Sequence, residues 1–192
     1  QIGRIDFVRR NGKPGDWWPI ARKVFEAHPL EPYAMQFAAE ADLEEILASE
    51  GFQNRRLLSP TERSRLEAAA TILISRWDHA RVADGAIRPE DAAVCCNILV
   101  TLHALGNLNA AIDIAHQGLS LAPNDVEIIT RAAVVAIDAD DELFARSLLA
   151  KLPRSSDAAV LKFRFHAARG DWEEVVRIAE DDALLIPASE AP

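Results

Sequence analysis

Apolar and polar positions along the chain recur with the helical period, and no segment shows the sustained alternation of a strand bounded by turn residues. Helix breakers and caps separate the apolar segments. At Ser59-Pro60-Thr61-Glu62, an N-cap serine, a first-turn proline and a capping-box glutamate together mark the start of a helix. The pattern therefore predicts an all-α chain. Its helices are expected at 16–28, 33–49, 60–83, 89–105, 108–121, 125–139, 141–152, 157–169 and 171–184.

Three segments share one spacing of glycine, apolar residues and proline. Gly106 is followed by small or apolar residues at offsets of 2, 5 and 9 and by proline at 17, and the same offsets recur after Gly170 and Gly15. A fourth, degenerate copy has Asp140 in place of the glycine. Glycine permits the sharp reversal between two helices, and the residues at +5 and +9 share one face of the second helix. Since a single hairpin cannot bury its apolar face, the copies are expected to stack into a solenoid.

Residues 91–187 resemble the tetratricopeptide repeat (TPR) family, whose unit is a helix–turn–helix of about 34 residues. The second-helix half matches in Ala111-x3-Ala115…Pro123 and Val175-x3-Ala179…Pro187, and the first-helix half keeps apolar character in Cys95-x2-Ile98-Leu99-x2-Leu102. The resemblance implies antiparallel helix hairpins stacked into a right-handed TPR-like α-solenoid.

The resemblance is uneven along the chain, and this predicts its domain organisation. About three TPR-like repeats are expected in 91–187, followed by a tail at 188–192. The N-terminal helical region, 1–90, is expected to be continuous with the solenoid. It would contain half a repeat at 15–32 and longer, irregular helices at 33–84.

Composition narrows the class of protein. Of 192 residues, 34 are alanine, which favours closely packed helices, and the formal net charge of −9 argues against nucleic acid as a partner. No apolar run reaches the roughly 18 residues that cross a bilayer, so no membrane partner is expected. Two cysteines are too few for a disulfide scaffold, and reduced thiols suit a cytoplasmic location. The chain starts with Gln1 and has 17 arginines against 4 lysines, so we interpret it as a segment of a larger bacterial protein.

Candidate catalytic and metal-binding residues do not form a recognisable motif. Cys95 and Cys96 diverge by about 100° on a helix, and the five histidines show no H-x3-H or H-E-x-x-H arrangement. No nucleophile elbow or nucleotide-binding glycine motif occurs. The acidic run 138–142 lacks the glycine and distal glutamate of a calcium loop, and it is expected at a turn and the first turn of the next helix. We therefore expect a non-enzyme without cofactor or metal.

Each of the four tryptophans is interpreted either as a core residue or as an exposed anchor. Trp17 and Trp172 occupy the same repeat position, and both are expected in the core together with Trp77. Trp18 is adjacent to Trp17 and must point elsewhere, so it is either a further core residue or an exposed anchor for a partner.

A solenoid presents a concave face built from its first helices. If Cys95, Ile98, Leu99 and Leu102 point inward, their neighbours face the groove, and a shift by one repeat gives the equivalent positions in the next two units. The candidate binding residues are Cys96, Val100, His103, Glu127, Thr130, Val134, Asp157 and Arg164, with Trp18 as a separate candidate; Ala93, Ile137, Val160 and Ala167 complete the same face. Because residues 91–105 carry no Lys or Arg, a clamp for a C-terminal carboxylate is not expected.

These features predict a non-catalytic protein–protein interaction module that binds a peptide or partner helix in a mildly acidic groove. Residues 91–192 carry 8 basic and 16 acidic groups, which favours a basic or at least non-acidic partner. The alternative is self-association, or a regulatory scaffold packed against an attached enzyme domain. A third possibility, a metal-dependent hydrolase built from the histidines, predicts stoichiometric bound metal.

Overall fold

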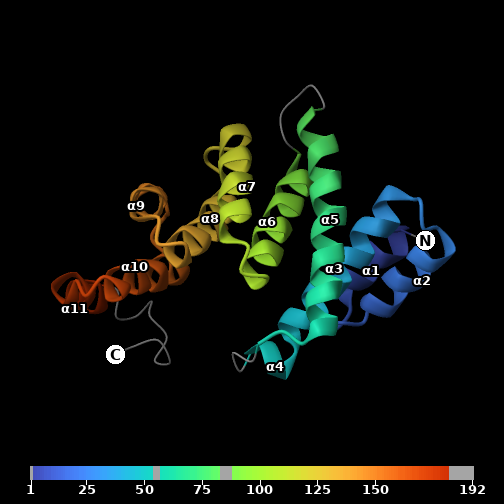
Figure 1. Ribbon diagram of the computed structural model, residues 1–192, viewed down its shortest axis with the longest axis horizontal. Coiled ribbons are helices and arrows are strands. Elements are labelled where there is room, and N and C mark those ends of the chain that lie inside the picture. Colours follow the sequence, from blue (N-terminus) through green and yellow to red (C-terminus); the bar gives the residue numbers. More distant parts are fainter. Residues whose placement is uncertain (1, 54–56, 83–87, 182–192) are drawn as a thin grey trace. The chain divides into compact units, whose positions relative to one another are not determined.

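The computed structural model describes residues 2–53, 57–82 and 88–181, which are helical throughout apart from short loops (Figure 1). No strand occurs in these three ranges. The helices are α1 (Ile2–Asn11), α2 (Trp18–Ala27), α3 (Pro32–Ala48), α4 (Glu50–Gln53), α5 (Pro60–Val82), α6 (Pro89–Ala104), α7 (Leu108–Leu121), α8 (Val126–Asp138), α9 (Glu142–Leu149), α10 (Ser156–Ala168) and α11 (Trp172–Asp181). The prediction of an all-α chain is confirmed.

The predicted helix boundaries agree with these bounds to within three residues wherever both ends lie in the described ranges, and the ends of α7 coincide with the prediction. Helix α1 was not predicted. Its only fully buried residue is Ile5, and four charged side chains interrupt the apolar pattern, so the periodic signal is weak. The short α4 was not predicted either. The expected continuations at 83 and 182–184 and the tail at 188–192 lie outside the described residues.

Side-chain caps explain why several helices start where they do. Ser59 and Glu62 form the predicted capping box: the backbone N–H of Ser59 donates to Glu62 Oε2 (2.8 Å), and the backbone N–H of Glu62 donates to Ser59 Oγ (3.3 Å). Asp141 Oδ1 accepts from the backbone N–H of Phe144 (3.1 Å) at the start of α9. The acidic run therefore lies at a turn and a helix start, as predicted.

The chain forms two compact units, one ending at Gly106 and the other beginning at Asn107. In the first unit, α3 packs against α2 and α5, and α5 packs against α6. Its core includes Trp17 and Phe37, whose rings meet edge to face with centroids 6.4 Å apart. The predicted division into 1–90 and 91–187 follows repeat spacing rather than contacts, and it stays a prediction.

The second unit consists of packed helix pairs. Helix α7 packs against α8, α8 against α9 and α10 against α11, and α8 also contacts α10. Inward-facing positions are small or branched, including Ala132, Ala133 and Ala145, each with no exposed surface. These small side chains let the helices approach closely, as the alanine content predicts.

The four predicted reversals each contain a residue with a positive φ angle. Gly15, Gly106 and Gly170 have φ angles of 90°, 77° and 70°, and Asp140 has a φ of 56°. At two of them a six-residue hydrogen bond closes the helix end: Asp141 N–H donates to Ala136 O (3.0 Å), and Asp171 N–H donates to His166 O (3.1 Å). The bends at Gly106, Asp140 and Gly170 are equivalent, because each lies two residues after the end of a helix and its N–H donates to the carbonyl three residues before it. Gly15 shares only the positive φ and lies four residues after the end of α1.

One prediction about the repeat position after the bend is wrong. Trp17 and Trp77 are buried, but 62% of Trp172 is exposed. The two tryptophans differ in burial because their surroundings differ, although they occupy the same repeat position. Trp17 is enclosed by a cluster that draws on α1, α2 and α3. Helix α11 packs mainly on α10, and this packing leaves most of the Trp172 side chain in contact with solvent.

Candidate interaction groove

Helices α8 and α10 form the two walls of an open groove in the second unit. Its volume is about 660 Å³, within the range of ligand-binding clefts. Its lining residues are Val126, Glu127, Thr130, Arg131, Val134, Asp157, Val160 and Leu161.

Local sequence places these residues on the groove side. Asp125 caps α8 by accepting hydrogen bonds from the backbone N–H groups of Glu127 and Ile128, both at 3.0 Å. With the start of α8 fixed, Val126, Thr130 and Val134 follow one another at intervals of four residues and share one face. Ser155 caps α10 in the same way, with its Oγ 3.2 Å from the backbone N of Ala158. Asp157, Val160 and Leu161 therefore lie in the first turns of α10.

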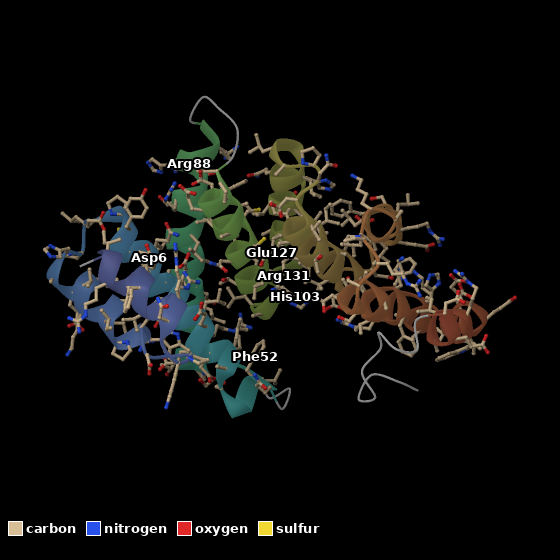
Figure 2. The ribbon with its side chains drawn as sticks, turned by 180° about the vertical axis from the view of Figure 1, so that it is seen from behind. Asp6, Phe52, Arg88, His103, Glu127 and Arg131 are labelled. Atoms are coloured by element: carbon tan, nitrogen blue, oxygen red, sulfur yellow. The ribbon has the colours of Figure 1, made fainter. Side chains whose placement is uncertain are left out.

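The groove has an apolar floor and a charged rim. Leu161 is buried, Val134 and Val160 are half-buried, and Val126 is 49% exposed. Thr130 turns its hydroxyl to its own helix, donating to Val126 O (2.7 Å). Glu127, Arg131 and Asp157 are exposed, and Figure 2 shows Glu127 and Arg131 along α8. Two carboxylates against one guanidinium leave the rim with an excess of one negative charge.

Part of the predicted site is brought together here. Glu127, Thr130, Val134, Asp157 and the neighbouring Val160 all line the groove. Arg164 does not line it, although it lies on α10. Its Nη2 is 3.2 Å from Asp138 Oδ1 on α8, so it links the two helices.

Three lining residues were missed by the sequence reasoning, namely Val126, Arg131 and Leu161. A four-residue step would have found two of them, because Val126 precedes Thr130 and Arg131 follows Glu127 by one helical turn. Leu161 is the residue directly after Val160, so it lies on a different face of α10. It lines the floor of the groove.

The remaining predicted residues belong to the first unit. On α6, Cys96 is only 4% exposed, and Val100 and His103 are half-buried. Trp18 is half-buried against the core cluster that contains Trp17, and its indole Nε1 donates to Glu44 Oε2 (3.2 Å). This environment agrees better with the core interpretation of Trp18 than with an exposed anchor.

The described ranges also contain cysteine, histidine and carboxylate side chains outside the groove. Among those residues, no three histidine, cysteine, aspartate or glutamate side chains are placed to hold a metal ion. Cys95 and Cys96 both carry buried thiols. None of the described helices is long and apolar enough to cross a bilayer.

The structure also resembles a known one. No protein-family model matches the sequence, and no curated protein matches it either. A solved structure titled "Functional Characterization of Pseudomonas Aeruginosa pilF" superposes with a TM-score of 0.52 at 17% identity, covering 97% of this chain and 90% of that chain. PilF is a TPR-repeat protein. The chain has a TPR-like fold.

In a TPR-like fold, α8 and α10 are the first helices of neighbouring repeats, and α9 and α11 are the second helices. The groove thus lies between two first helices, where the concave face of such a repeat is expected. At 17% identity the likeness to PilF establishes the fold and carries no information about what this chain binds.

Proposed function

We propose that the chain is a non-catalytic protein-interaction module that binds a short amphipathic helix or peptide in the α8–α10 groove. The observation that supports this most directly is the combination of a preformed apolar floor with an exposed charged rim. Five of the lining residues came from repeat register alone, which is independent of the cavity itself. A TPR-like fold supports an interaction function in general.

The dimensions of the groove limit the size of the ligand. Val126 and Val134 are eight residues apart, which corresponds to about 12 Å along a helix axis. A partner helix of about three turns would present apolar side chains at i, i+4 and i+7 to this length of floor. A longer partner would extend beyond it.

The charge of the rim limits the chemistry of the ligand. Glu127 and Asp157 outnumber Arg131, and the sequence from 91 to 192 has twice as many acidic as basic residues. A partner with one or two Lys or Arg residues beside its apolar face would be electrostatically complementary. Acidic helices would be disfavoured.

The decisive experiment is a selection from displayed 16-residue helical peptides, about four and a half turns long, followed by titration of the selected peptides. Val134→Asp places a charge on the floor, and we expect it to weaken binding by about tenfold or more. Val176→Asp is the matched control, because Val176 is 55% exposed on α11 and does not line the groove. Circular dichroism establishes that both variants remain helical.

A second pair of variants tests the rim. Glu127→Lys reverses a charge in the groove, whereas Glu173→Lys reverses an exposed charge on α11. We expect only the first to weaken the basic peptides. The proposal is contradicted if no peptide binds the wild-type chain, or if Val134→Asp and Val176→Asp bind the selected peptides equally well.

A second candidate function rests on a different surface. Trp172 and Val176 are 62% and 55% exposed and lie one turn apart on α11. An exposed apolar pair of this kind favours burial against another protein surface. This supports self-association, or packing as a regulatory scaffold against an attached enzyme domain.

A further inference from the structure

A second cavity lies wholly in the first unit, where α3, α5 and the start of α6 meet. Its volume is about 410 Å³. Its lining includes the apolar or aromatic side chains of Tyr33, Met35 and Ile72 and the basic side chains of Arg76, His79 and Arg88. None of these residues belongs to the groove of α8 and α10.

The two arginines are fixed by one buried carboxylate. Asp91 is 4% exposed. Its Oδ1 accepts from Arg76 Nη2 (3.0 Å), and its Oδ2 accepts from Arg88 Nε (2.9 Å). Arg88 stands directly before α6, where Figure 2 labels it. Held in this way, both guanidinium groups are oriented before any ligand arrives, which lowers the entropy lost on binding.

The charges of the cavity do not cancel. Two guanidinium groups face one carboxylate, so one positive charge is left over. Glu90 lies 3.4 Å from Arg88, but both side chains are more than half exposed, and such a pair is screened by water. Arg76 is only 15% exposed, and its Nε and Nη1 make no hydrogen bond to the described part of the chain. Nη2 carries a second N–H, and it shares one edge of the guanidinium with Nε and the other with Nη1, so a planar acceptor can bind along the edge that Asp91 leaves open.

The apolar part of the lining indicates the rest of the ligand. The Tyr33 ring lies with its centroid 5.8 Å from Arg76 Cζ, so an apolar group beside the ring would be close to the guanidinium. We propose that this cavity binds a small monocarboxylate with an apolar or aromatic body. A phosphate dianion would need a second uncompensated cation, which the two arginines do not supply and which His79, also in the lining, would supply only as an imidazolium.

Phenylacetate is the probe, and phenylacetamide is its uncharged control of nearly the same shape. We expect phenylacetate to shift amide resonances of α3 and α5 in the 192-residue chain and to bind about tenfold more tightly than phenylacetamide. Benzylphosphonate provides the dianionic comparison and is expected to bind more weakly than phenylacetate. Equal binding of the amide, tighter binding of the phosphonate, or no shift with any probe would each overturn the proposal.

Substitutions in and outside the cavity test whether phenylacetate binds there. Arg76→Gln should abolish the preference for phenylacetate over its amide. Arg81→Gln removes a charge from the same helix outside the cavity and should leave that preference intact. If Arg76→Gln fails to fold, Ser75→Phe decides, because it fills the cavity and leaves both arginines on Asp91. Unchanged phenylacetate binding by Ser75→Phe would overturn the assignment.

Discussion

At the scale of single residues, the repeat depends on a left-handed backbone at four positions. Glycine occupies three of them, and Asp140 occupies the fourth with a φ of 56°. Aspartate tolerates this conformation better than most residues, because its short polar side chain bonds locally. Asp140 Oδ1 also accepts from Arg169 Nη2, a residue 29 positions later in the sequence (3.3 Å). The degenerate copy therefore keeps the bend although it has lost the glycine.

Exchanging glycine at these bends should show this dependence. Gly170→Ala places a Cβ at φ 70° with nothing closer than Trp172 Nε1 at 3.9 Å, so the penalty is backbone strain rather than a clash. We expect it to lower the free energy of unfolding by about 1–2 kcal/mol, and Asp140→Gly to raise it by several tenths to about 1 kcal/mol. Urea titration followed by circular dichroism measures both.

Gly3→Ala is the matched control for these bends. Gly3 lies in α1, and a Cβ there meets nothing within 4 Å. Alanine favours a helix interior, so this change should stabilise the chain by up to about 1 kcal/mol. If Gly3→Ala and Gly170→Ala had the same effect, the strain at the bend would not be what distinguishes the two positions.

Asp91 should make the stability of the first unit depend on pH. Burial would raise the pKa of this carboxyl, but hydrogen bonds from Arg88 and the charges of Arg76 and Arg88 outweigh burial and hold the pKa below its usual range. A carboxyl with a lowered folded pKa stabilises the fold above its unfolded pKa of about 3.9. That contribution is lost as pH falls through the lower folded pKa.

Asp91→Asn is the corresponding variant. At neutral pH it should lower the free energy of unfolding by about 1–3 kcal/mol, because two arginines lose a charged acceptor. Below pH of about 4 the difference from wild type should shrink. A difference that stays constant from neutral pH into this acid range would contradict the assigned role of the carboxylate. Thermal unfolding across the pH series provides the measurement.

At the scale of elements, the positions of the helices could be predicted from spacing and caps, but the burial of individual side chains could not. The capping box at Ser59 and the four bends were predicted because they depend on neighbours in sequence. The burial of Trp172 was predicted wrongly, because it depends on whether another helix covers α11. Helix α1 was missed because Ile5 alone is fully buried on it.

The first unit shows why repeat spacing fails in its middle. Helix α3 carries acidic side chains that bind arginines from three other helices: Arg9 of α1 binds Glu40 (2.7 Å), Arg22 of α2 binds Asp42 (2.7 Å), and Arg65 of α5 binds Asp42 (2.6 Å). These pairs join residues 20 to 31 positions apart. Specific ion pairs thus supplement packing where the apolar repeat is absent.

The two tryptophans at equivalent repeat positions should respond differently to truncation. Trp17 is 2% exposed, and Trp17→Ala should lower the free energy of unfolding by about 3–5 kcal/mol through the cavity that it leaves. Trp172 is 62% exposed, and Trp172→Ala should stay within about 0.5 kcal/mol of wild type. Denaturant unfolding of both variants tests this. A loss of similar size at Trp172 would mean that the exposed surface of α11 is covered in solution.

At the scale of the whole molecule, repeat register predicted a groove on the first helices, and five of the residues predicted for its face line the α8–α10 groove. That this groove binds a partner stays a prediction. The prediction extended the same groove to Cys96, Val100 and His103 of α6. Repeat spacing predicts which face of each helix is shared but not how one hairpin packs on the next, so the sequence could not specify how far the face continues. Nor could it find the arginine cavity, since Tyr33, Arg76 and Arg88 are brought together by tertiary contacts among α3, α5 and α6.

The oligomeric state separates the two proposed functions. If the groove binds a separate partner, light scattering should show one mass over about a hundredfold range of protein concentration, because no second copy is required. Self-association through α11 instead predicts a mass that rises with concentration, and the double variant Trp172→Ser with Val176→Ser should return it to that of the monomer. The groove variant Val134→Asp serves as the control, since it should leave the mass unchanged in either case. A dimer abolished by Val134→Asp but kept by the α11 variant would instead assign the groove to a second copy of the chain.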